Sequence, residues 1–308
     1  MKKIIAVDHG NRMVKTVNHA FASGFMESGH LPHNDNDDIL LYDGKEYIIS
    51  DKRLPQQNDK TKDENFFILT LFAIGKDILS IYKPRSTDIV EVELLLGLPP
   101  LHFRAMKQDF EQYFTGRGRI SFVFNKTPFT IEITRAYVYY QAFAAVYTVI
   151  DDIEDSPIVN VVDIGGHTID CMQFIDDGFN VNLTTSLEGG INLLIQGIDG
   201  IIRSKGGKSI PDVMIEGILQ KKRKALAHSS ERTKSVRDKA REFANSIILE
   251  VSQAGFDLRE YNTVFVGGGS MLLKDFLMES ENSSKFIFVD DLHANARGYK
   301  MIYDDQER

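Results

Sequence analysis

The chain has 308 residues, which corresponds to about two domains at the usual size of roughly 100–200 residues. Its composition, 43% hydrophobic and 26% charged, is that of an ordinary globular protein and excludes a disordered tail or a fibrous repeat. The formal net charge of −8 argues against a surface that binds nucleic acid directly. The single cysteine, Cys171, excludes a disulfide framework and a cysteine-based zinc site, and we expect a cytoplasmic protein.

The hydropathy pattern predicts no membrane targeting. The apolar run at residues 4–7 ends at Asp8, far short of the apolar region of a signal peptide. No run of about 18 apolar residues occurs in the sequence, so we expect no membrane-spanning segment.

The first half of the chain reads as strands and hairpins with helices between them. In chain order we expect a buried strand at 3–8, strands at 12–17 and 20–26, a hairpin at 39–50 around Asp43-Gly44, a helix at 63–82, a strand at 90–98, a helix at 102–114 and a hairpin at 118–134. Residues 137–150 are almost continuously apolar and too long for an ordinary strand, so we expect a buried helix there. Residues 151–157 are acidic, end in a proline and are the predicted domain boundary.

The second half begins again with the same kind of pattern. Here we expect strands at 158–162 and 168–174, helices at 189–202, 211–219 and 235–251, strands at 263–266 and 286–289, and a helix at 294–302. The basic, polar residues 221–234 between two of these helices are expected to face solvent.

Two short segments repeat each other about half a chain apart. Asp8-His9-Gly10 and Asp163-Ile164-Gly165-Gly166 each follow an apolar strand and precede a second strand. The repeat predicts two related α/β domains that face each other across a cleft. We expect the first domain at 1–150, with the C-terminal helix 294–308 packing back onto it, and the second at 151–293.

The repeated segments have the chemistry of a magnesium–phosphate site. An aspartate at a strand end can hold a hydrated Mg²⁺ ion, and the glycines let backbone N–H groups approach phosphate oxygens. Lys15 lies on the second strand of the first hairpin, where its ammonium could reach a phosphate. For either copy alone, an ordinary strand-ending turn remains the alternative.

Other motifs have simpler interpretations. The run 267–270, Gly-Gly-Gly-Ser after a strand, fits either a surface for a base or ribose or a tight turn into a helix. The run 206–209 is not a P-loop, because Ile202 stands where that motif needs a glycine. Four histidines show no metal-ligand spacing, so packed or solvated side chains are a better interpretation than metal ligands; they are His9, His102, His167 and His293. Cys171 lies in an apolar strand and is expected to be inert.

Taken together, these motifs resemble the actin/Hsp70/sugar-kinase ATPase superfamily over nearly the whole chain. Residues 6–15 resemble its first phosphate motif, 137–146 its first connecting helix, 161–170 its second phosphate motif, 266–270 its adenosine motif and 294–298 its second connecting helix. Within it, the chain is most similar to the ParM/StbA group of bacterial actin-like plasmid-segregation proteins. The similar features are the Asp-x-Gly-Asn start with its Val-Lys pair, the strand 92–98 followed by Pro99, and Asn295-Ala296-Arg297-Gly298.

This resemblance implies roles for individual residues. Asp8 and Asp163 would hold Mg²⁺ through water, and the implied catalytic residues are Asp163 and Gln141, which would position the attacking water. The implied phosphate-binding residues are Gly10, Asn11, Lys15, Gly165, Gly166 and Thr168. The other implied nucleotide contacts are Glu188 and Gly189 from the second domain and the adenosine residues Gly267, Gly268, Gly269 and Ser270. His9 and Arg12 depart from the small residues that many relatives carry in the first turn.

The same resemblance implies an ATPase that polymerises into dynamic filaments on binding Mg-ATP, with GTP as the alternative nucleotide. Its partners would be further copies of itself and a DNA-bound adaptor of the ParR type, with no direct contact to nucleic acid or membrane. The alternatives are a non-filamentous actin-fold ATPase and a small-molecule kinase. A kinase needs a general base near the acceptor hydroxyl, and the sequence shows no additional Asp motif of that type.

Overall fold

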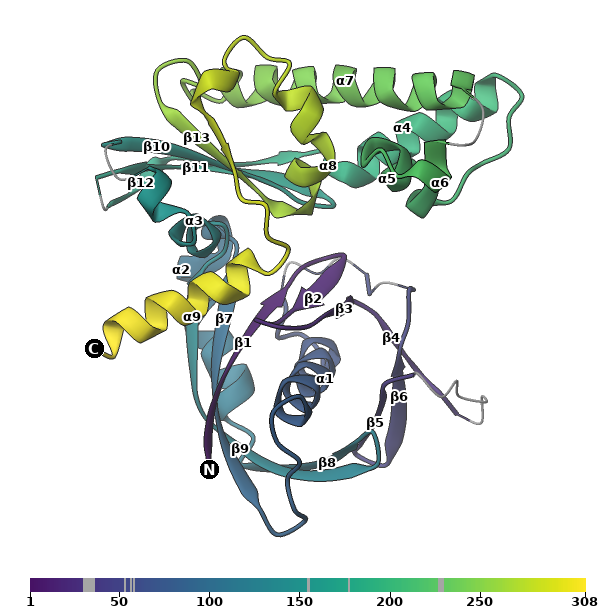
Figure 1. The fold of residues 1–308 in the computed structure, drawn as a ribbon. Helices are drawn as coiled ribbons and strands as arrows, with labels where there is room; N and C mark the ends of the chain where they lie inside the picture. Colours follow the sequence, from purple (N-terminus) through teal and green to yellow (C-terminus); the bar gives the residue numbers. More distant parts are fainter. Residues whose placement is uncertain are drawn as a thin grey trace. The chain divides into compact units, whose positions relative to one another are not determined.

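The computed structural model describes residues 1–29, 37–52, 54–55, 57, 59–153, 156–176, 178–226 and 230–308, apart from the side chain of residue 181. The chain divides into two compact units (Figure 1). Unit 1 comprises residues 1–148 and 291–308, and unit 2 comprises residues 149–290. These bounds lie within three residues of the division expected from the sequence, and each unit is described by itself below.

Unit 1 is built on a nine-stranded sheet in the described part of the chain, with the order β3-β2-β1-β7-β9-β8-β5-β6-β4. Its strands are β1 (Lys2–His9), β2 (Met13–Lys15), β3 (Ala20–Ala22), β4 (Phe25–Glu27), β5 (Ile39–Tyr42), β6 (Lys45–Ile49), β7 (Ile89–Leu98), β8 (Arg119–Phe124) and β9 (Thr127–Tyr140). Its helices are α1 (Asn65–Leu79), α2 (Pro100–Thr115), α3 (Phe143–Tyr147) and α9 (Ala294–Gln306). Strands β1, β7 and β9 run parallel to one another, so their carboxyl ends meet at one edge.

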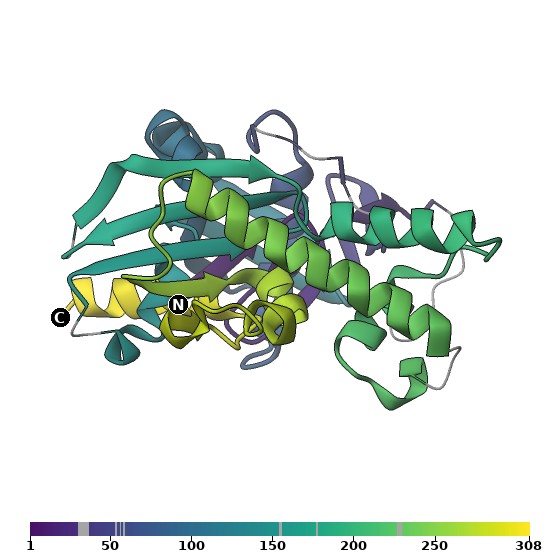
Figure 2. The same cartoon turned by 90° about the horizontal axis from the view of Figure 1, so that it is seen from above.

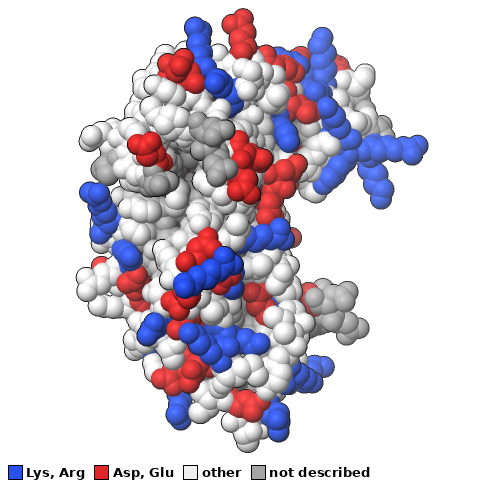
Figure 3. All heavy atoms as spheres, turned by 60° about the vertical axis from the view of Figure 1, so that its left-hand side comes forward, with Lys and Arg blue, Asp and Glu red and all other residues white. Residues whose placement is uncertain are grey.

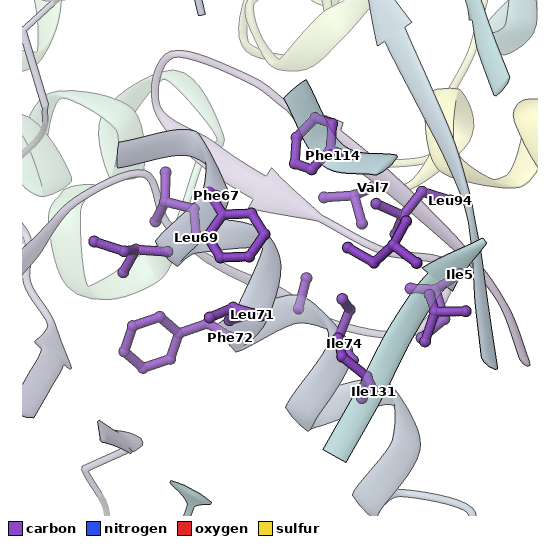
Figure 4. Packing of buried hydrophobic residues seen from close by; sticks show 14 of the residues in the cluster. Ile5, Val7, Phe67, Leu69, Leu71, Phe72, Ile74, Leu94, Phe114 and Ile131 are labelled. Carbon is purple, nitrogen blue, oxygen red and sulfur yellow. The ribbon is translucent and has the colours of Figure 1, made fainter. Parts of the chain in front are cut away.

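The core of unit 1 forms where the sheet curls around α1 (Figure 1). Helix α1 is apolar over most of its circumference, as expected of a helix that is buried on all sides. Its side chains pack against β1, β7 and β9, as Val7, Leu94 and Ile131 show in Figure 4. The C-terminal helix α9 packs on β1, β7 and α3, with Tyr299 fully buried.

The prediction of a helix at residues 137–150 is wrong for most of that range. Strand β9 continues to Tyr140, pairing in parallel with β7 up to Leu98, and only the five-residue helix α3 follows. Aromatic and β-branched residues at 137–140 favour a strand, and a long apolar run cannot by itself distinguish a buried strand from a buried helix. Gln141, expected on that helix, therefore lies in the turn between β9 and α3.

The described residues of unit 2 form a five-stranded sheet in the order β12-β11-β10-β13-β14. Its strands are β10 (Ile158–Ile164), β11 (Thr168–Ile175), β12 (Gly178–Glu188), β13 (Asn262–Val266) and β14 (Phe286–Phe288). Its helices are α4 (Ile191–Ser204), α5 (Asp212–Leu219), α6 (Arg223–Leu226), α7 (Ser230–Gln253) and α8 (Gly267–Leu277), with 3₁₀ turns at Ile150–Asp152 and Ser283–Lys285. The sequence prediction omitted β12 and began α7 five residues late.

One face of the unit 2 sheet is covered by helices. Helix α8 packs on β10 and β13, and α7 lies alongside α4 and α8 (Figure 2). The inward stripe of α7 is made of small and β-branched residues at helical spacing, which are Val236, Ala240, Ala244, Ile247 and Val251. This stripe joins the buried side chains of the strands in one core.

The topology confirms the repeat seen in the sequence. In unit 1, β1 pairs antiparallel with β2 and parallel with β7, and β7 pairs parallel with β9. In unit 2, β10 pairs antiparallel with β11 and parallel with β13, and β13 pairs parallel with β14. The repeated aspartates thus end topologically equivalent strands, β1 and β10.

The surface carries charges of both signs. Figure 3 shows Lys and Arg side chains interspersed with Asp and Glu side chains over one face. Within the described residues, no helix combines the length and the apolar character needed to cross a bilayer.

Candidate functional site

Asp8 is the centre of a buried polar cluster at the carboxyl edge of the unit 1 sheet. The residue is 2% exposed, and three side chains donate hydrogen bonds to its carboxylate. Lys15 Nζ lies 3.0 Å from Oδ2, Gln141 Nε2 lies 2.9 Å from Oδ1, and Asn295 Nδ2 lies 3.4 Å from Oδ2. Burial by itself raises the pKa of Asp8, but Lys15, with smaller contributions from Lys60 and Asn295, holds it below the usual value. The carboxylate is therefore ionised at neutral pH.

Gln141 reaches Asp8 through an unusual turn. Ala142, the next residue, has a φ of 66°, a conformation that is rare for residues other than glycine. The side-chain oxygen of Asn295 accepts a hydrogen bond from the Ala142 N–H at 2.9 Å. Asn295 thus fixes the turn while its amide nitrogen reaches Asp8, and this role went unassigned in the sequence although its Asn-Ala-Arg-Gly motif was noted.

The first hairpin turn places Gly10 next to Lys15. A Cβ atom on Gly10 would lie 2.8 Å from the Met13 carbonyl oxygen and 3.3 Å from Lys15 Nζ. Asn11 is exposed in the same turn. The three residues predicted to bind phosphate in this hairpin are therefore close together in unit 1, and Lys15 lies against Asp8.

His9 is a core residue. Of the two interpretations that the sequence allowed, a packed or a solvated side chain, the structure has the packed one. Its ring is 2% exposed, stacks on Phe114 and meets Phe66 and Phe110 edge-on. Its Nε2 atom pairs with Thr70 Oγ1 at 2.8 Å. Burial, reinforced by the positive charge of Lys60, lowers its pKa to about 3, so the ring is neutral.

Lys60 is a second cation near Asp8, and unlike Lys15 it is buried; the sequence analysis missed it. Its side chain is 8% exposed, and its Nζ donates to the His9 carbonyl oxygen at 3.0 Å. Burial lowers its pKa to about 8, against an opposing effect of Asp8. Lys60 lies in an irregular segment before α1 with no recognisable motif, so no sequence signal pointed to it.

In unit 2 the second hairpin holds Asp163 and the glycine turn together. In the strand register, Asp163 lies opposite Asp170 of β11 on one side and opposite Val266 of β13 on the other. The Gly165 N–H donates to the Thr168 carbonyl oxygen at 2.9 Å, which closes the turn. Thr168 Oγ1 lies 3.3 Å from Asp170 Oδ2.

The glycine turn also receives the start of α4. The N–H groups of Ile191 and Asn192 donate to the carbonyl oxygens of Gly165 and Gly166 at 3.0 and 2.9 Å. A Cβ atom on Gly190 would lie 2.5 Å from the Gly165 oxygen, so only glycine allows this approach. Gly189 donates to the His167 oxygen at 3.1 Å, and Glu188 ends β12 with an exposed side chain. The predicted residues of this region are thus adjacent in unit 2.

The glycine run after β13 lies against the same hairpin. Gly267 has a φ of 87°, and a Cβ atom there would lie 2.2 Å from Asp163 Oδ1. Gly269 packs equally closely against Ile164, whereas a Cβ atom on Gly268 would meet nothing within 4 Å. Ser270 is fully buried and donates its hydroxyl to the Gly267 oxygen at 2.7 Å. Packing therefore explains Gly267 and Gly269, and Gly268 is the glycine of this run that packing leaves unexplained.

These arrangements suit Mg²⁺ and phosphate. Mg²⁺ in nucleotide sites keeps several waters and takes only one or two protein carboxylates, so a single aspartate at each hairpin fits it. Among the described residues, no group of three or more His, Cys, Asp or Glu could hold a metal ion by itself.

Comparison with known proteins identifies the family. The family model for the N-terminal domain of actin-like proteins matches residues 6–143, and that for the C-terminal part of the archaeal actin homologue MreB-like matches residues 161–279. No curated protein sequence matches the chain.

Several solved structures share the fold over the whole chain. The crystal structure of an archaeal actin homolog has a TM-score of 0.79 at 18% identity, covering 98% of this chain and 99% of its own. The apo ParM protein of pSK41 has a TM-score of 0.74 at 15% identity, covering 100% and 99%. A ParM from a 15-stranded filament of Clostridium botulinum has a TM-score of 0.75 at 20% identity, covering 99% and 100%. The chain has the actin-like fold and belongs to the actin-like proteins.

Proposed function

We propose that the chain is an ATPase that polymerises into filaments on binding Mg-ATP. The observation that carries this proposal is the ionised, buried carboxylate of Asp8, held by Lys15, Gln141 and Asn295. A second aspartate, Asp163, ends the equivalent strand of unit 2 beside a glycine turn. A carboxylate at a strand end beside a glycine turn suits hydrated Mg²⁺ and phosphate oxygens, and each unit carries one such pair.

Each residue has a definite part in this proposal. Lys15 and the hairpin glycines bind phosphate oxygens, and Mg²⁺ neutralises charge on the phosphates when bound. Because Gln141 commits its Nε2 to Asp8, its side-chain oxygen is the group that accepts a hydrogen bond from the attacking water. Asp163 is the second residue to which we assign a part in orienting the attacking water. Gly268 offers an open backbone surface against which the adenosine can lie.

The related structures support nucleotide binding and assembly. One structure of the archaeal actin homolog is a complex with ADP, and an AlfA filament is bound to AMPPNP. The Clostridium botulinum ParM is itself a filament. We extend these properties to this chain and propose plasmid segregation as its role. A DNA-bound adaptor of the ParR type would then connect filament to plasmid, which agrees with the net charge of −8.

Right-angle light scattering with simultaneous phosphate release tests the proposal. We expect scattering to rise with Mg-ATP, to stay low with Mg-ADP, and to decay as phosphate appears. Asp163→Ala should prolong the signal if Asp163 serves hydrolysis, or abolish it if Asp163 serves binding.

The alternatives give different results in the same experiment. Phosphate release with no rise in scattering at saturating nucleotide would indicate a non-filamentous ATPase. Phosphate transfer that requires an added acceptor would indicate a kinase. The absence of both scattering and phosphate release, with ATP and with GTP, would overturn the proposed activity.

A further inference from the structure

Lys60 is buried beside the first phosphate hairpin by a local turn. Asp59 accepts hydrogen bonds from the backbone N–H and the hydroxyl of Thr61, at 2.9 and 2.6 Å. This turn spans Lys60, whose side chain is 8% exposed. Its ammonium lies 5.5 Å from the centre of the Phe66 ring and 3.0 Å from the His9 carbonyl oxygen.

The charge of Lys60 is not taken up by an ion pair with a described side chain. Asp8 is already paired with Lys15 at 3.0 Å, and His9 is neutral. Lys60 interacts electrostatically with both Asp8 and Lys15. Among the described side chains, no carboxylate forms an ion pair with Lys60. Lys60 is therefore a buried ammonium close to Asp8 with no ion-pair partner among the described side chains.

A buried ammonium without an ion-pair partner is costly unless a counter-ion compensates its charge. An ammonium has three N–H donors, and the His9 oxygen takes one of them. The other two donors and the positive charge of Lys60 suit an anion bound at the hairpin turn that starts one residue after His9, at Gly10.

We propose that Lys60 is a second phosphate-binding cation, which contacts the polyphosphate tail of the nucleotide together with Lys15. This assignment rests on the proposed nucleotide binding and adds to it a residue outside the recognised motifs. It also places the turn at residues 59–61 next to the ligand.

Lys60→Met tests the assignment, because methionine keeps the length of the side chain and removes the charge. The probes are Mg-ATP, Mg-ADP and adenosine, with dissociation constants from calorimetry. We expect affinity for Mg-ATP to fall about 10- to 100-fold, that for Mg-ADP to fall less, and that for adenosine to stay unchanged. Lys62→Met, two residues away and exposed, is the matched control and should bind like the wild type.

The melting temperature without ligand separates this role from a structural one. Removing an uncompensated buried charge should leave the ligand-free melting temperature unchanged or raise it, while the increase caused by Mg-ATP shrinks. An equal loss for ATP, ADP and adenosine, or a lower ligand-free melting temperature with unchanged ATP affinity, would show that Lys60 only supports the fold. If Lys60→Met does not fold, Lys60→Gln removes the charge and keeps a polar side chain, and it should lose most of the preference for ATP over adenosine; retention of that preference overturns the assignment. Failure of the wild type to bind any nucleotide would instead overturn the proposed function, and this assignment with it.

Discussion

The side-chain amide of Gln141 donates a hydrogen bond to Asp8 Oδ1 at 2.9 Å, although 133 residues separate the two in the chain. The contact exists because β1 and β9 both run parallel to β7, which brings their carboxyl ends to one edge of the sheet. Gln141 follows β9 directly, and Asp8 is the last but one residue of β1. The contact joins the proposed metal-binding aspartate to the proposed water-positioning residue.

Gln141→Ala should impair hydrolysis more than nucleotide binding. Removal of the amide leaves the attacking water unaligned, and we expect the rate of phosphate release at saturating Mg-ATP to fall on the order of 100-fold. The dissociation constant for a non-hydrolysable analogue should change far less. Gln220→Ala, at the exposed end of α5, is the control. Equal losses in binding and hydrolysis would mean that Gln141 merely orders Asp8.

His9 should make the protein less stable in mild acid. Its folded-state pKa of about 3 lies below the usual 6.5, so between these values the unfolded chain binds a proton that the folded chain does not. The contribution of the neutral His9 ring to the free energy of unfolding is therefore fully present above about pH 6.5. It falls as the pH is lowered, by up to about 1.4 kcal/mol per pH unit. Urea unfolding at about pH 5 and about pH 7 measures the difference.

His9→Asn removes the titrating ring and keeps a polar side chain facing Thr70. The variant should show a smaller loss of stability between the two pH values than the wild type, whatever its stability at neutral pH. His102→Asn, on the half-exposed side of α2, should keep the wild-type dependence. An unchanged slope in His9→Asn would show that the acid sensitivity arises elsewhere.

Tyr303→Phe should loosen the C-terminal helix α9. The Tyr303 hydroxyl donates to Glu93 at 2.7 Å, and Glu93 is 3% exposed in the middle of β7. Loss of a hydrogen bond to a buried carboxylate should cost about 1.5–3 kcal/mol, visible as a lower melting temperature and faster proteolysis of the C-terminus. The matched control is Tyr147→Phe, which removes an exposed tyrosine–aspartate hydrogen bond to the same helix and should cost under about 0.5 kcal/mol. Similar effects of both changes would contradict the importance of burial here.

Gly267→Ala and Gly268→Ala should separate packing from ligand contact. Alanine at 267 would be strained by the φ of 87° and would meet Asp163 Oδ1, so we expect a loss of more than about 1 kcal/mol in stability. Alanine at 268 has open space and should leave the ligand-free melting temperature unchanged. If the adenosine lies on Gly268, this second variant should weaken nucleotide binding several-fold. Unchanged affinity would remove Gly268 from the proposed site.

The features predicted correctly from the sequence are local patterns. The hairpin around Asp43-Gly44 and helix α1 follow from turn chemistry and helical periodicity within a few residues. The repeated strand–Asp–x–Gly pattern located the two equivalent hairpins, because strand ends and glycine turns are encoded by adjacent residues. Residues 137–140 were misassigned because an apolar run has no period, and pairing with β7 decides in favour of a strand.

The sequence by itself determined where the aspartates, glycines and strands of the two hairpins stand, since these depend on neighbouring residues. Only the tertiary structure decided which distant side chains surround them. Asn295 and Lys60 reach the Asp8 region from the last helix and from an irregular segment, and His9 turns away into the core. Burial and long-range pairing make these choices, because a buried charge must find partners wherever the fold brings them, and those partners leave no periodic signal in the chain.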